Sequence, residues 1–152
     1  MKKTKLFKIS PKEKIELEFV PNTKLKNVAI TPWTMMEPIF KFGKIKVSEL
    51  FYNEFSHSEQ VFIIHHELWH SKNNINHEIK MLKKNLLLLF CDKQVSYSQE
   101  FTADMYVRKN TNKKYALSTL IKLKKLIQKG VIPKSHERTH PPIDERIKKI
   151  RQ

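Results

Sequence analysis

Along the first third of the chain, apolar and polar residues alternate as they do in β-strands. Residues 15–19 read Ile-Glu-Leu-Glu-Phe, which is the period of two expected of a strand with one buried face. Residues 28–31 form a second short candidate, and residues 38–47 predict two short strands that turn near Gly43. The pattern therefore predicts a small N-terminal sheet that is mostly antiparallel.

Helical signals replace the strand pattern from Ser48 onward. Capping boxes of the form Ser-x-x-Glu/Gln begin at Ser56 and Ser96, and each marks the start of a helix. The sequence predicts helices over residues 56–72, 75–90, 96–108 and 115–127, the last one closed by Gly130, and a short terminal helix from Pro142. Strands followed by helices predict an α+β fold, which we expect to form one domain over residues 1–152.

The chain has no apolar run long enough for a membrane helix. The longest run, residues 86–91, is far short of the roughly 20 residues that span a bilayer. The basic N-terminal residues have no apolar stretch behind them, unlike a secretory signal. Cys91 is the only cysteine, so it forms no internal disulfide and supplies no cysteine-based zinc cluster. We expect a soluble, cytoplasmic protein without an integral membrane segment.

The formal net charge of +15 introduces the alternative of a nucleic-acid or anionic-surface partner. Lysine accounts for all but four of the 30 basic residues, and these lysines are spread over the whole chain. Arginine is the usual reader of bases, and it occurs only at positions 108, 138, 146 and 151. A general bias toward lysine explains the charge as well as a polyanion partner does, and we favour that explanation.

A motif on the predicted helix 56–72 carries the chemistry of a metal site. The residues are His66-Glu67-Leu68-Trp69-His70, directly after an apolar run. Residues four apart stack on one helix face, so His66 and His70 direct two imidazoles at one point. Glu67 lies about 100° further around the helix. Zinc hydrolysis needs this combination, two neutral nitrogen ligands and a carboxylate near the metal's open position.

A catalytic zinc site takes a third protein ligand. His77 lies two turns beyond His70, roughly 10.5 Å along the axis, which is too far to share an ion in an unbroken helix, and Glu78 fails for the same reason. Glu100 is the better candidate. Asp104 lies four residues further along, so one of these two carboxylates can bind the ion while the other orients a ligand imidazole.

Three blocks of the sequence together resemble the M48 group of gluzincin metallopeptidases. They comprise residues 64–70, 100–104 and 139–147, in the order that the family has them. Because membrane segments are missing, the chain looks closest to the soluble minimal members, the minigluzincins. The resemblance implies a zincin-like α+β fold and a zinc-dependent endopeptidase that cleaves extended or unstructured polypeptide.

The resemblance also implies a role for each residue of the metal site. His66, His70 and Glu100 bind one Zn²⁺ per chain. Glu67 acts as the general base, taking a proton from the attacking water, and then as the general acid that passes the proton to the leaving amine. Asp104 holds the first histidine ligand by a hydrogen bond.

Further roles follow from the same resemblance. His140 faces the active site, where it stabilises the developing oxyanion, and Arg146 anchors the terminal helix near the cleft. In the family, the strand before the active-site helix is an edge that pairs with extended substrate. Here that strand supplies the substrate-binding residues Lys44, Ile45, Lys46 and Val47.

The sequence departs from the family's pattern at Trp69, where the family usually has a small residue. An indole beside His70 either packs into the core or restricts the cleft. Several minigluzincins are zymogens, so a latent form is a further expectation, with residues 1–10 or 129–138 covering the cleft. Two other functions stay open: a catalytically silent zinc-binding module with a regulatory role, and a basic nucleic-acid-associated protein.

Overall fold

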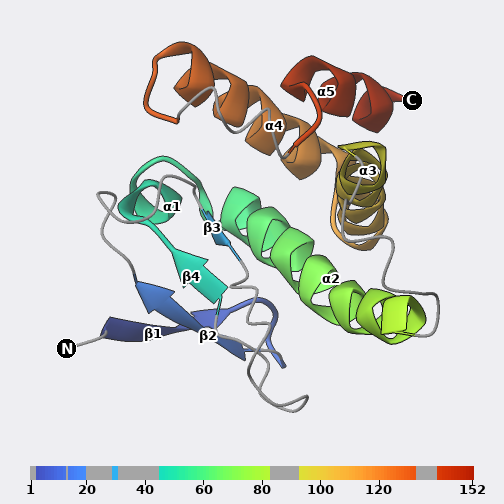
Figure 1. Ribbon diagram of the computed structural model, residues 1–152. Helices are drawn as coiled ribbons and strands as arrows, with labels where there is room; N and C mark the ends of the chain where they lie inside the picture. The colour runs from blue at the N-terminus through green and yellow to red at the C-terminus, as the bar shows by residue number, and fades with distance from the viewer. Residues whose placement is uncertain (1–2, 13, 20–28, 31–44, 83–92, 133–139) are drawn as a thin grey trace.

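A four-stranded sheet forms the N-terminal part of the computed structural model, which describes residues 3–12, 14–19, 29–30, 45–82, 93–132 and 140–152 (Figure 1). The strands are β1 (Lys3–Lys8), β2 (Lys14–Phe19), β3 (Ala29–Ile30) and β4 (Ile45–Val47), in the order β1-β2-β4-β3. β1 and β2 are antiparallel, as are β3 and β4, whereas β2 and β4 run parallel. The predicted mostly antiparallel sheet is confirmed.

The first strand, β1, was not predicted from the sequence. It pairs with β2 over six residues, from Lys3 opposite Phe19 to Lys8 opposite Lys14. Three of its six residues are lysines, a composition typical of an edge strand, and they obscure the alternation around the buried Phe7. This part of the N-terminal segment, which we expected as a cover for the cleft, is therefore held in the sheet.

The strand predicted to bind substrate lies inside the sheet. Ile45–Val47 pairs with β2 on one side and with Ala29–Ile30 on the other, and Ile45 and Val47 are buried. The expectation of an open edge at residues 45–47 is wrong, because β3 adds a strand there. Lys44 lies outside the described residues, as do residues 38–42, where a further strand was predicted.

The helices in the described part of the chain are α1 (Glu49–Asn53), α2 (His57–Leu82), α3 (Lys93–Asn110), α4 (Lys113–Gln128) and α5 (Ile143–Arg151). The short helix α1 was not predicted. α2 runs without interruption through residues 73–74, where the sequence predicted two separate helices. The predicted helical residues 83–90 lie outside the described part.

Helix α2 begins as predicted. Glu59 Oε2 accepts hydrogen bonds from the backbone N–H and the hydroxyl of Ser56, at 2.8 and 3.0 Å, which is the reciprocal bond of a capping box. The second predicted capping box is wrong, because α3 begins at Lys93 and Ser96 lies inside the helix. Helix propensity before Ser96 is sufficient to extend the helix backward past this local signal.

The ends of α4 and α5 agree with the sequence prediction to within two residues. α4 starts at Lys113, where Asn112 accepts a hydrogen bond from the Lys114 N–H at 2.7 Å. After α4, Gly130 adopts a φ of 71°, the left-handed conformation that commonly closes a helix. Pro142 is the N-cap residue of α5.

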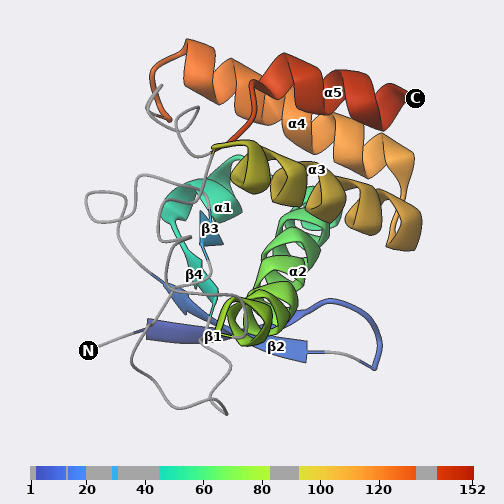
Figure 2. The same ribbon diagram turned by 45° about the vertical axis from the view of Figure 1, so that its right-hand side comes forward.

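Helix α2 lies between the sheet and a layer formed by α3, α4 and α5, as Figures 1 and 2 both show. Its apolar residues pack into two cores. Ile63 and Ile64 belong to the core shared with the sheet and α1, whereas Phe62 belongs to the core shared with α3, α4 and α5. His66 and His70 follow Phe62 at intervals of four residues, so the packing of Phe62 turns both histidines toward the helical layer.

Candidate metal centre and active site

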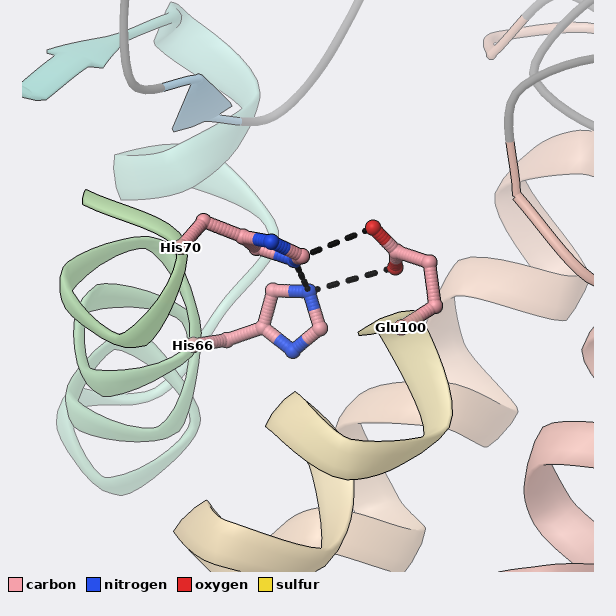
Figure 3. Close-up of side chains that lie close together, drawn as sticks. All are labelled: His66, His70 and Glu100. Carbon is pink, nitrogen blue, oxygen red and sulfur yellow. Dashed lines mark hydrogen bonds and ion pairs between the residues drawn. The ribbon is translucent and has the colours of Figure 1, made fainter. Parts of the chain in front are cut away.

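Two histidines of α2 and one glutamate of α3 meet at a single point (Figure 3). The Nε2 atoms of His66 and His70 are 3.1 Å apart. Glu100 Oε2 lies 3.3 Å from His66 Nε2, and Glu100 Oε1 lies 3.0 Å from His70 Nε2. The structure thus brings together the three residues predicted as ligands. His77 lies further along the unbroken α2, as the spacing argument required.

The geometry of these three side chains fits a zinc ion. In a tetrahedral site with bonds of about 2.0–2.1 Å, ligand atoms lie roughly 3.3–3.4 Å apart. The two Nε2 atoms are close to this separation, and each of them lies at a similar distance from one of the two Glu100 oxygens. Glu100 Oε2 is buried and makes no hydrogen bond within the described part of the chain. Two imidazole lone pairs and a carboxylate at this separation repel each other unless a cation or a proton lies among them.

Asp104 connects the first histidine to helix α5. Its Oδ1 lies 3.0 Å from His66 Nδ1, and a carboxylate at this nitrogen fixes the imidazole with Nε2 free to bind a metal. Arg146 donates to both oxygens of Asp104, from Nε and from one terminal nitrogen, at 2.7 Å each. A second terminal nitrogen lies 3.6 Å from Glu100 Oε2. Arg146 therefore contacts both carboxylates that the site depends on.

Sequence analysis placed Arg146 near the cleft but did not find this role. Arg146 is only 3% exposed, and its bidentate partner is 42 residues earlier in the chain. The available signal was the helical spacing in α5, where Arg146 stands between the buried Ile143 and Ile147. A charged residue on the buried side of an amphipathic helix predicts a buried partner of opposite charge.

The charges of these side chains compensate one another. Burial alone lowers the pKa of His66, but the carboxylates of Glu100 and Asp104 outweigh it and raise this pKa to about 10. Burial alone raises the pKa of Glu100, but His66, His70 and Arg146 hold it well below its usual range. A metal ion that bound Nε2 of His66 would therefore displace a proton from this residue.

For Asp104 and Arg146, too, the charges of neighbouring residues outweigh the effect of burial on the pKa. Burial disfavours the charged form of Asp104, yet Arg146 and His66 lower its pKa to about 2. Burial likewise disfavours the charged guanidinium, and Asp104, Glu100 and Glu67 raise the pKa of Arg146 above its ordinary value. Asp104 and Arg146 are therefore both ionised at neutral pH.

The two residues predicted to act on substrate lie at this site. Glu67 is half-buried, on the turn of α2 between the two histidine ligands, and close enough to influence the pKa of Arg146. His140 Nε2 lies 3.7 Å from Glu100 Oε1, and the His140 side chain is 22% exposed. His140 therefore reaches the site from the segment directly before α5, although this segment is far from α2 in the sequence.

Two imidazoles from one helix and a carboxylate from the next form a set of side chains that could hold a metal ion. Residues 85–152 match the model of peptidase family M48. The match confirms the predicted resemblance to the M48 group, and it supports an M48-family metallopeptidase. No curated protein and no solved structure matches the chain.

The family match covers only part of the candidate metal centre. The matched segment contains Glu100, Asp104, His140 and Arg146, but it begins after the His66–His70 motif. The two histidines are linked to that segment by their contacts with Glu100 and Asp104. None of the described helices is long and apolar enough to cross a membrane.

Proposed function

We propose that this chain is a zinc-dependent endopeptidase that hydrolyses peptide bonds in extended or unstructured polypeptide, with one zinc ion per chain. The observation that carries the proposal is the convergence of His66, His70 and Glu100 at 3.0–3.3 Å. The carboxylate of Glu67 on the same turn adds the proton acceptor that a site used only for metal storage does not need.

Zinc bound here supplies Lewis-acid chemistry, polarising a water and a carbonyl oxygen. Glu67 accepts the proton of the attacking water and passes it to the departing amine. His140, at the exposed side of Glu100, donates a hydrogen bond to the oxygen that becomes negative during attack. Asp104 keeps the proton of His66 on Nδ1 and so leaves Nε2 as the ligand atom.

An extended substrate would add to the sheet at β3 rather than at β4. Among the strands that the structure describes, β3 is the terminal one on that side of the sheet, and it lies against α2, the helix that carries the two histidines. An extended peptide that adds to a sheet gains backbone hydrogen bonds whatever its sequence. This mode suits an enzyme that acts on unstructured polypeptide.

The metal stoichiometry tests the first part of this proposal. Purified protein is expected to contain one zinc ion per chain, measured by elemental analysis, and Glu100→Ala is expected to lose most of it because one of three ligands is removed. Thermal stability should fall with the metal content, since an ion that binds only the folded site stabilises it. Glu145→Ala, at an exposed position of α5, serves as the control. Full zinc occupancy at unchanged affinity in Glu100→Ala would place the third ligand elsewhere.

Latency is a separate part of the proposal. Of the two predicted covers, the first is largely held in strand β1, and Ile132 within the second is buried in the core against the sheet. This leaves residues 133–138, which lie outside the described part. We predict that a protease nick in this segment raises turnover on casein. Equal turnover of the nicked and intact proteins would show that the site is open from the start.

Two other functions are distinguished from the proposed one by simple assays. A catalytically silent zinc module binds zinc and leaves casein intact. A nucleic-acid-associated protein binds a specific sequence in excess of bulk DNA and loses this affinity steeply as salt rises. Casein cleavage that stops on chelation and returns with zinc excludes the first function and supports the peptidase.

A further inference from the structure

The two histidine ligands are held by different means. His66 has a carboxylate partner on its second ring nitrogen, with Asp104 Oδ1 at 3.0 Å from Nδ1. His70 contacts Glu100 and His66 through Nε2, and within the described part of the chain no carboxylate or carbonyl accepts a hydrogen bond from its Nδ1. Two rings lie edge-to-face against the His70 ring. One is the imidazole of His66, with ring centroids 4.8 Å apart, and the other is the indole of Trp69, with ring centroids 5.3 Å apart and an angle of 83° between the planes.

Trp69 lies outside the two hydrophobic cores that the described residues form. Its neighbour Leu68 packs against the core shared with the sheet, whereas Trp69 packs against neither core as the structure describes them. Trp69 is nevertheless half-buried. In an α-helix, a residue directly before His70 lies about 100° around from it, on the opposite flank from Glu67. The indole therefore stands beside the histidine pair, away from the proton acceptor.

We propose that Trp69 is a positioning residue that holds the His70 imidazole in its ligating orientation. An edge-to-face contact restricts rotation of the imidazole about its side-chain bonds, as Asp104 restricts His66 through the contact of its carboxylate with Nδ1. This inference rests on the proposed zinc site. It assigns the bulky residue at this position a role in metal binding and places it outside the hydrophobic core.

Fluorescence gives a direct readout, because the chain has two tryptophans, Trp33 and Trp69. In a Trp33→Phe background, Trp69 is the only tryptophan. Its emission is expected to change with added Zn²⁺ and to saturate at one ion per chain. Added Co²⁺, a paramagnetic ion with similar ligand preferences, should quench the emission at the same stoichiometry. If both ions bind and the emission does not change, the proposed contact between Trp69 and the metal-binding His70 is wrong.

Zinc affinity in the same background tests the positioning role. Competition with a chelator should show a loss of about 10-fold for Trp69→Ala, at the lower end of the effects known for residues that orient a metal ligand. Trp69→Phe keeps a ring edge and should stay within roughly threefold of the parent. The Co²⁺-loaded Trp69→Ala variant should show altered visible absorption, because that spectrum reports ligand geometry.

Leu68→Ala provides the matched control, since Leu68 is the adjacent half-buried residue and packs against the core shared with the sheet. It should lower the unfolding temperature of the metal-free protein and leave zinc affinity unchanged below that temperature. Trp69→Ala should lower the zinc affinity and leave the unfolding temperature of the metal-free protein unchanged.

Parent-like zinc affinity in Trp69→Ala, or Trp69→Phe binding as weakly as Trp69→Ala, would overturn the positioning role. In both cases the parent still binds zinc, so the proposed function survives. A parent that binds no zinc overturns the proposed site together with this inference.

Discussion

The Glu67→Gln variant is expected to lose peptide cleavage by about 10²- to 10⁴-fold, the range that a positioned general base contributes, while it keeps its zinc and its fold. Glutamine has nearly the same shape as glutamate, but its amide cannot take up the proton of the attacking water at neutral pH. Glu67 is not one of the three residues that form the metal cluster, so zinc content should remain at one ion per chain. The measurement is the initial rate on casein, with elemental zinc analysis of the same sample.

A neutralised glutamate elsewhere is needed to separate this role from an effect of net charge. Glu49 is exposed at the start of α1, and Glu49→Gln makes the same chemical change away from the site. It should keep the parent rate. A Glu67→Gln variant with full zinc occupancy and a rate near that of the parent would remove Glu67 from the mechanism and leave His140 as the nearest alternative.

The part of the site within one helix could be predicted because it depends on local spacing. His66 and His70 share a face of any regular helix, so their convergence required only that residues 57–82 be helical. Glu100 was found by a weaker argument, since nothing in the sequence fixes how α3 crosses α2. The structure supplies that crossing through Phe62 and Val107, which pack into the same core from the two helices.

The parts that could not be predicted depend on long-range packing. Arg146 and Asp104 are far apart in sequence, and only the docking of α5 against α3 joins them. The position of β4 inside the sheet likewise follows from the pairing of Ala29–Ile30, a stretch of only two strand residues. The apparent cap at Ser96 failed for a different reason, because helix propensity before it extended α3 back to Lys93.

The Arg146→Met variant is expected to lose about 3–5 kcal/mol of unfolding free energy, as when one partner of a buried ion pair is removed. Methionine keeps most of the side-chain volume but leaves the buried Asp104 and Glu100 carboxylates without their guanidinium. The loss is a large share of the about 5–15 kcal/mol that stabilises a typical protein. Urea unfolding of the metal-free protein at neutral pH measures this loss. The Arg146→Lys variant keeps the charge but not the bidentate geometry, so its stability should lie between those of the parent and Arg146→Met.

The pH dependence of this loss identifies its cause. Asp104 has its pKa lowered from 3.8 to about 2 in the parent, so its contribution to stability is present above pH 3.8 and disappears as the pH falls toward 2. Without Arg146 that pKa rises, and the difference between parent and variant should be largest at neutral pH and smaller at pH 3. Arg151→Met removes the same charge from an exposed position of α5 and should change stability by no more than about 0.5 kcal/mol at either pH. A constant difference across this range would mean that Arg146 stabilises the fold through packing alone, and that its contact with Asp104 contributes nothing to holding α5 against the metal site.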